Sequence, residues 1–436
     1  MRRKQIVYGL LILMLVSSSC GAVSPAPEKS SFQPEVSANT EGPGEPSEKD
    51  YLTNPLFETE DYLADYDHDN RFSGMFGKIA ETDTAVYAVS PEAGYYLLYY
   101  DKTTGEADPL CFKSECAHTD KTCQAYLGLT DSLLSFYGGK LYFLSTDAGE
   151  TGGKTAAGQT LFRCAPDGSA REAVLTLDRD YLIGEQPQYY ILHRGFLYGV
   201  GCKQTVDENG MPIVSISIKA FPVDEKGDPV TVFEKTFSGL AGTPEVVCRG
   251  NSLYFVIIKT EKEKRTLEIH CWNSRYRKLE LLYDGVPEGT KLIGGTGTFG
   301  LDGSEVCFCC EKDGQLIVYG LTAAGAVEKF RFNHDADENV YISDGVICFL
   351  KTDPDTWHLY FTDFAGNLIG HADTARSEDT FLGFCGGNRK NFYYMPIARK
   401  ASGMVFRLTR IDFTEGKEPE TLMCLSEESA ETEDTP

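Results

Sequence analysis

The chain has 436 residues and is acidic, with 65 Asp and Glu residues, 41 Lys and Arg residues and a formal net charge of −24 at pH 7. A field of this sign repels nucleic acid and anionic lipid headgroups, and no Lys- or Arg-rich run offsets it. We therefore expect no nucleic-acid partner. The acidity serves either solubility at a crowded surface or the attraction of a cationic partner.

The first 19 residues have the parts of a secretion signal in order: a basic stretch (residues 2–4), an apolar run (6–16) and small residues (17–19). The apolar run is too short to span a bilayer comfortably. Cys20 follows directly and resembles the lipid-modified first residue of a mature bacterial lipoprotein, although Ser17 stands where that motif usually has Leu. We expect a lipid anchor at Cys20 and a location on the outer face of the cell membrane. The alternative is secretion with a free Cys20.

Residues 20–50 and 426–436 are expected to be disordered. The first stretch mixes five prolines with Ser, Glu and Gly and buries too little apolar surface to fold, so it is interpreted as a flexible tether. The second is an acidic tail. Between them lie a lead-in segment, residues 51–70, and one folded domain, residues 71–425, without a second linker.

One sequence pattern recurs seven times in this domain. It consists of a turn flanked by Gly or Asp, a short strand that is usually rich in Tyr or Phe, a polar loop and a second strand. The copies are anchored at residues 84–89, 139–144, 195–200, 251–256, 303–308, 344–349 and 389–394. Their spacing of roughly 41 to 56 residues is the period of a four-stranded propeller blade. We expect an all-β fold, a seven-bladed β-propeller with blades beginning near residues 71, 130, 187, 243, 291, 339 and 379. A six-bladed ring with an appended sheet is the alternative.

This organisation, the lipoprotein-like signal and the cysteine motif described next resemble the propeller lipoproteins of anaerobic Gram-positive gut bacteria. The resemblance covers roughly residues 70–425. That family has no firmly assigned activity, so the resemblance implies a fold and a location more than a function.

Cys111, Cys116, His118 and Cys123 lie within thirteen residues. Three thiolates and an imidazole are a tetrahedral donor set for structural zinc, although the spacing C-x4-C-x-H-x4-C is not a common zinc-finger spacing. The cluster follows the outer strand of the first blade, where one structural zinc ion would hold together the otherwise irregular connection to the second blade.

A disulfide with one free thiol is the competing interpretation, because exported proteins usually meet an oxidising environment. The other internal cysteines are mostly scattered one per strand, which is typical of small buried hydrophobes. A nucleophilic Cys116 beside His118 would need a geometry that the sequence does not establish.

Tyr95, Tyr96, Tyr99 and Tyr100 suggest a sugar-stacking surface, because an aromatic face combines apolar area with a polar tip. Packing between blades is the competing interpretation. Residues 65–70 alternate carboxylates as a calcium loop does, but they lack the Gly and the bidentate Glu of an EF-hand, and a solvated acidic turn is the alternative.

The remaining histidines are dispersed, and no catalytic motif stands out, so no catalytic residue is assigned. We expect a monomeric, non-catalytic binding or scaffolding propeller that meets a protein or glycan at a loop face and the membrane only through its anchor. One alternative is a hydrolase or lyase acting on envelope or dietary polysaccharide at the propeller channel. Another is a sensory or assembly accessory of a membrane protein.

Overall fold

The computed structural model describes residues 55–72, 78–90, 96–118, 122–127, 133–146, 159–177, 187–223, 227–261, 264–293, 299–333, 339–400, 403–414 and 416–426. All of them belong to the second of the two units into which the chain divides, Tyr51–Pro436. Cys20, Tyr95, the tether and most of the acidic tail lie outside the described residues.

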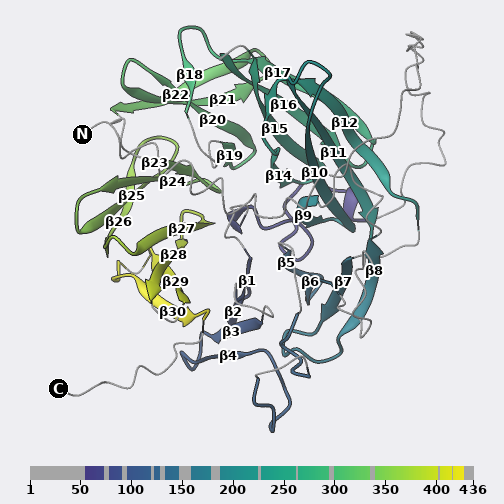
Figure 1. Cartoon of the computed structure of the whole chain (residues 1–436), viewed down its shortest axis with the longest axis vertical. Helices are drawn as coiled ribbons and strands as arrows, with labels where there is room; N and C mark the ends of the chain where they lie inside the picture. Colours follow the sequence, from purple (N-terminus) through teal and green to yellow (C-terminus); the bar gives the residue numbers. More distant parts are fainter. Residues whose placement is uncertain are drawn as a thin grey trace. The chain divides into compact units, whose positions relative to one another are not determined.

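The described residues form seven antiparallel blades in a ring (Figure 1). Blade 1 contains β1 (Ile79–Glu81), β2 (Ala85–Val89), β3 (Leu97–Asp101) and β4 (Ala107–Pro109). Blade 2 contains β5 (Leu134–Tyr137), β6 (Lys140–Thr146), β7 (Gln159–Cys164) and β8 (Glu172–Leu177). Blade 3 contains β9 (Pro187–His193), β10 (Phe196–Val206), β11 (Pro212–Pro222) and β12 (Val230–Ser238).

Blade 4 contains β13 (Leu240–Ala241), β14 (Glu245–Arg249), β15 (Ser252–Glu261), β16 (Lys264–Asn273) and β17 (Lys278–Gly285). Blade 5 contains β18 (Lys291–Leu292), β19 (Phe299–Asp302), β20 (Glu305–Lys312), β21 (Gln315–Thr322) and β22 (Gly325–Asn333). In these two blades a pair of short strands shares the first position, and both members pair with the same neighbour.

Blade 6 contains β23 (Asn339–Ile342), β24 (Ile347–Thr352), β25 (Thr356–Thr362) and β26 (Leu368–Ala375). Blade 7 contains β27 (Thr380–Gly387), β28 (Asn391–Lys400), β29 (Gly403–Asp412) and β30 (Glu420–Cys424). Ahead of the ring lie two single-turn 3-10 helices, η2 (Pro55–Phe57) and η3 (Asn70–Phe72). The described part of the chain contains no helix long and apolar enough to cross a bilayer.

The core is divided among the junctions between blades. Seven apolar clusters fill it, and each joins two neighbouring blades. Blade 3, for example, meets blade 4 through Ile216, Ile218, Phe255 and Trp272. Inner strands such as β2 and β6 supply alternate apolar residues to the junctions on their two sides, as strands buried on both faces do. Seven blades are therefore confirmed, and the six-bladed alternative is wrong.

The ring closes between blade 7 and blade 1 without exchange of strands, since every blade is built from one contiguous stretch of chain. Apolar packing joins the two blades, with Val86 and Tyr100 in one cluster with Tyr393 and Leu408. The Tyr100 hydroxyl also donates to Glu420 Oε1 at 2.9 Å. Closure therefore depends on side-chain contacts.

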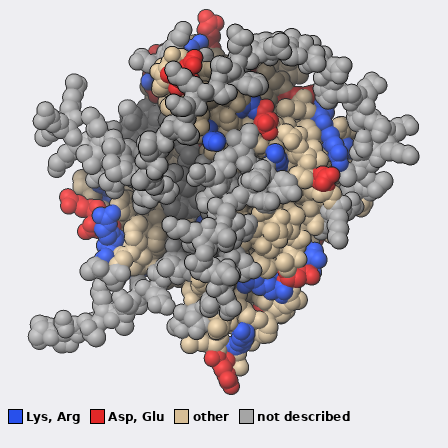
Figure 2. All heavy atoms as spheres, turned by 45° about the vertical axis from the view of Figure 1, so that its right-hand side comes forward, with Lys and Arg blue, Asp and Glu red and all other residues tan. Residues whose placement is uncertain are grey.

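Two faces of the ring are distinguished below. The first-turn face carries the turns between the first and second strands of each blade, such as the turn between β9 and β10. The second-turn face lies at the opposite ends of the strands and carries the turns between the second and third strands, such as the turn between β10 and β11. In the view of Figure 2, Lys and Arg side chains are interspersed with Asp and Glu over the described surface.

Candidate functional site

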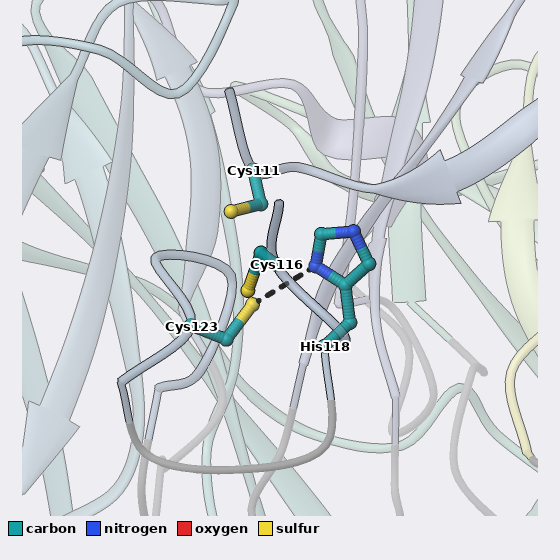
Figure 3. Close-up of side chains that lie close together, drawn as sticks. All are labelled: Cys111, Cys116, His118 and Cys123. Atoms are coloured by element: carbon teal, nitrogen blue, oxygen red, sulfur yellow. Dashed lines mark hydrogen bonds between the residues drawn. The ribbon is translucent and has the colours of Figure 1, made fainter. Parts of the chain in front are cut away.

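Cys111, Cys116, His118 and Cys123 come together in the connection from β4 to β5 (Figure 3). Their donor atoms lie within 4.8 Å of one another, and His118 Nδ1 is 3.3 Å from Cys123 Sγ. The backbone bends to allow this: the Cys116 N–H donates to the Lys113 carbonyl at 3.1 Å, and His118 has a φ of 55°. A positive φ at a residue other than Gly is uncommon and marks a constrained turn.

These four side chains fit a zinc ion. Zn–S distances of about 2.3 Å and Zn–N distances of about 2.0 Å place tetrahedral ligand atoms roughly 3.5 Å apart. The present separations, all within 4.8 Å, need only small side-chain rotations to reach that value. Four protein ligands leave no coordination position for a substrate, so zinc here would be structural.

The thiols of this cluster differ in acidity. Burial alone would raise the pKa of Cys111, but the backbone N–H groups of Lys113 and Gln124 outweigh it and hold that pKa below its usual value. Burial raises the pKa of Cys123 to about 12. The Cys111 thiol is therefore more acidic than the Cys123 thiol, and a metal ion would displace the protons that its ligands carry.

The zinc interpretation uses all four side chains, whereas a disulfide joins two thiols and leaves His118 aside. All cysteines among the described residues are free thiols. Eight of the ten outside the cluster are buried, as expected for small hydrophobes: Cys164, Cys202, Cys248, Cys307, Cys309, Cys310, Cys348 and Cys385. Cys271 is half-buried and Cys424 is exposed.

The connection that carries the cluster is attached to both neighbouring blades. The Leu97 N–H of β3 donates to the Ala125 carbonyl at 2.8 Å. From blade 2, Arg171 Nη1 donates to the carbonyls of Gln124 and Tyr126, both at 3.2 Å. A metal ion at the cluster would therefore stiffen the junction between blades 1 and 2.

The described tyrosines of the expected sugar-stacking surface do not share one face. Tyr96 forms a β-bridge with Tyr126 and packs edge-on against its ring at 5.6 Å. Tyr99 packs toward blade 2, whereas Tyr100 is 7% exposed and packs toward blade 7. Strand alternation separates Tyr99 from Tyr100, so both contribute to packing between blades.

A second site, on the first-turn face, was not foreseen from the sequence. Segment 55–72, purple in Figure 1, contacts six of the seven blades. With blade 1, Arg71 Nη1 pairs with Glu81 Oε2 at 2.5 Å. With blade 2, the Gly138 N–H donates to the Asp65 carbonyl at 2.6 Å. The segment therefore occupies the middle of the ring on this face.

Blades 4, 6 and 7 hold the same segment. The Asn70 side chain and the backbone of Cys248 exchange hydrogen bonds of 2.7 and 2.8 Å. Ser343 Oγ donates to the Arg71 carbonyl at 3.3 Å, and the rings of Phe72 and Tyr393 lie 5.4 Å apart.

Arg194, in the turn between β9 and β10, is the hub of these contacts. Its side chain is fully buried and pairs with the equally buried Asp67, with Nε 2.5 Å from Asp67 Oδ1. Its two terminal nitrogens also donate to three backbone carbonyls of the segment, those of Leu56, Thr59 and Asp61. Asp67 is thus an ion-pair partner inside the ring, and the interpretation of this residue as part of a solvated acidic turn is wrong.

Two pairs of histidines also meet, one between distant segments and one within a hairpin. The His193 Nδ1 accepts a hydrogen bond of 3.0 Å from the backbone N–H of His68, and its Nε2 lies 2.8 Å from the Gly250 carbonyl. His358 and His371 meet on blade 6. The meeting of His358 and His371 depends on strand register, and that of His68 and His193 depends on contacts between distant segments. Residue spacing in the sequence reveals neither.

No protein-family model matches this sequence, and no curated protein matches it. Solved structures with a similar arrangement include the acylaminoacyl peptidase of Pyrococcus horikoshii, at 13% identity and a TM-score of 0.48, covering 82% of this chain and 54% of that one. The β-propeller domain of the Trilobed protease from Pyrococcus furiosus has 11% identity and a TM-score of 0.46, covering 83% of this chain and 97% of that domain. An oligogalacturonate lyase in complex with manganese has 11% identity and a TM-score of 0.46, covering 78% and 89%.

Proposed function

We propose that this protein is a lipid-anchored, extracytoplasmic β-propeller that binds or scaffolds a protein or glycan partner without catalysis. The observation that carries the proposal is the docking of segment 55–72 on the first-turn face. The buried pair of Arg194 and Asp67 holds this segment over the middle of the ring on that face. A partner is then expected on the second-turn face, where the connections between the second and third strands of the blades converge.

One element of the second-turn face suits a partner. Strands β10 and β11 have 11 residues each, and the last four residues of β10 are exposed. Val206 and Met211, which flank the hairpin turn, are 68% and 59% exposed. Exposed apolar side chains on a rigid hairpin are typical of recognition surfaces.

The partner face is tested with a photo-crosslinking amino acid introduced at Met211 in living cells. Leu368, which is 64% exposed and begins β26 at the first-turn end of blade 6, is the matched control position. We expect one defined adduct from position 211 and none from position 368. Equal labelling at the two positions would refute a second-turn recognition face.

The anchor is tested separately by metabolic labelling with an alkyne fatty acid. The wild-type protein should carry the label and sediment with membranes, and Cys20→Ser should lose both properties. A labelled Cys20→Ser protein would exclude this attachment site.

The hydrolase or lyase alternative is supported by one observation on the first-turn face. Burial, reinforced by the negative charge of Asp69, raises the pKa of Asp344 to about 6. A carboxyl group that titrates near neutrality beside other carboxylates can serve as a general acid. Turnover of a wall or dietary polysaccharide that is lost in Asp344→Asn would favour this alternative over the non-catalytic proposal.

A further inference from the structure

The hairpin of β25 and β26 gathers two imidazoles and a carboxylate on one side of blade 6. His358 faces Asp373 across the hairpin, and Tyr360 faces His371, in antiparallel register. These four side chains share the partly exposed side of the hairpin. The alternate residues Leu359 and Ala372 are buried on the other side.

The donor atoms of the three ligand-type side chains converge. His358 Nδ1 lies 2.7 Å from Asp373 Oδ1, and His371 Nε2 lies 2.9 Å from the same oxygen. One donor atom from each residue lies within 4.8 Å of the other two. Because both imidazole nitrogens point at one carboxylate oxygen, the three donor atoms are close enough together to coordinate a single small cation.

Neighbouring groups fix both rings. On the far side of the His358 ring, Nε2 lies 3.2 Å from Asp353 Oδ2. If Nδ1 binds a metal ion, this carboxylate therefore orients the ring through Nε2. Arg376 Nη1 donates to the Asp353 carbonyl at 2.8 Å and holds that turn. The Tyr360 ring packs on His371 with a centroid distance of 4.8 Å. Metal-binding histidines are usually oriented by such hydrogen bonds to a carboxylate.

We propose that His358, His371 and Asp373 bind a divalent transition-metal ion such as Zn²⁺. Two neutral imidazoles and a carboxylate are ligands that suit zinc and its neighbours in the first transition series. Three protein ligands leave at least one coordination position for water or for an oxygen donor from outside the chain. The site thus differs from the cysteine cluster, where the protein supplies all four ligands.

The ion replaces the direct contacts between Asp373 and the two rings, so binding releases any proton carried by the ligating nitrogens. The site lies toward the second-turn end of blade 6, next to the turn between β24 and β25. It stands independently of the proposed binding function, because it rests on the hairpin register and the three donor atoms alone.

The test is a Zn²⁺ titration of the purified, metal-free full chain against a chromophoric chelator, in the wild type and in variants. We expect His371→Ala to lower the affinity of one Zn²⁺ on the order of 100-fold and Asp353→Asn to lower it about 10-fold. Asp355→Asn is the matched control, since it removes a carboxylate from the same turn outside the cluster and should leave the affinity unchanged.

Binding at the cysteine cluster is distinguished with Co²⁺. A thiolate-to-cobalt charge-transfer band reports only that cluster, so it should persist in His371→Ala and disappear in Cys116→Ser. Unfolding temperatures of the variants check that the blade remains intact. If His371→Ala and Asp353→Asn bind Zn²⁺ as tightly as the wild type, the three side chains form a surface ion cluster only and the proposal is overturned.

Discussion

Arg194 and Asp67 form an ion pair 127 residues apart in the sequence, with both side chains fully buried and Nε 2.5 Å from Oδ1. The pair joins the turn between β9 and β10 to segment 55–72. It is the contact on which the arrangement of the first-turn face depends, because Arg194 satisfies the carboxylate and three backbone carbonyls at once.

Arg194→Met should lower the free energy of unfolding by about 3–5 kcal/mol, because it leaves the buried Asp67 carboxylate without its cationic partner. Denaturant unfolding measures this. Arg163→Met, which removes the exposed pair with Glu172, is the control and should cost less than about 1 kcal/mol. Similar losses in the two variants would contradict the role given to Arg194.

Gly250→Ala should release segment 55–72 from the ring. Gly250 has a φ of 53°, and a Cβ at this position would lie 2.6 Å from the Glu60 carbonyl oxygen. Gly303→Ala is the control, since its φ of 62° imposes similar backbone strain but no atom lies within 4 Å of the added Cβ. Limited proteolysis should cleave the segment faster in Gly250→Ala than in Gly303→Ala. Equal cleavage rates in the two variants would show that the close approach of Gly250 to Glu60 does not hold the segment on the ring.

The protein should lose stability as the pH falls from about 6.5 to about 4. Burial lowers the pKa of His193 from 6.5 to about 4. The neutral ring accepts a hydrogen bond from the His68 N–H at Nδ1 and donates one to the Gly250 carbonyl from Nε2. Below pH 6.5 the His193 side chain takes up a proton in the unfolded state but not in the folded state. This residue alone therefore lowers the free energy of unfolding by at most about 3 kcal/mol, and its contribution to the loss is complete below pH 4. Denaturant unfolding at several pH values measures this loss.

His68 contributes in the same direction, since burial lowers its pKa to about 4. Both ring nitrogens of His68 are shielded from solvent and have no hydrogen-bond partner among the described residues. His68→Leu should therefore keep its stability at pH 7.5 and show a smaller loss between pH 6.5 and 4 than the wild type. An unchanged pH dependence in His68→Leu would mean that this ring is already protonated in the folded protein.

A zinc ion at the cysteine cluster would hold the connection between blades 1 and 2, and its removal should loosen that connection. A chelator should speed amide hydrogen exchange in residues 111–118 and 122–127, and Cys116→Ser should show fast exchange with or without the chelator. Cys424→Ser, at an exposed cysteine outside the cluster, should behave like the wild type. If a reductant, and not a chelator, speeds amide hydrogen exchange in these residues, the cysteines form a disulfide.

The sequence predicted the seven blades because their signals are local. Turn residues and alternating strands repeat within each stretch of about 50 residues, and β9, β18, β23 and β27 begin at or within one residue of the expected blade starts. The cysteine cluster was equally accessible, since its four residues span one short connection. Spacing alone was enough to nominate these residues, although it could not choose between zinc and a disulfide.

The position of segment 55–72 could not be predicted, because its partners lie in turns of distant blades. Asn251 donates to Glu60 Oε1 at 2.8 Å across 191 residues of sequence. His358 and His371 were overlooked for another reason: their meeting depends on the register of one hairpin, and a shift of one residue would put them on opposite sides.

The most direct test of the docked segment is hydrogen exchange of the full chain, followed by mass spectrometry on peptides covering residues 55–72. The backbone N–H groups of Tyr66 and Asp67 donate to the Leu63 carbonyl, and that of His68 donates to His193. We predict that these amides exchange as slowly as amides in the strands of blades 3 and 4. Exchange as fast as in an unstructured peptide would show that the first-turn face is open, and the assignment of partner binding to the second-turn face would lose its basis.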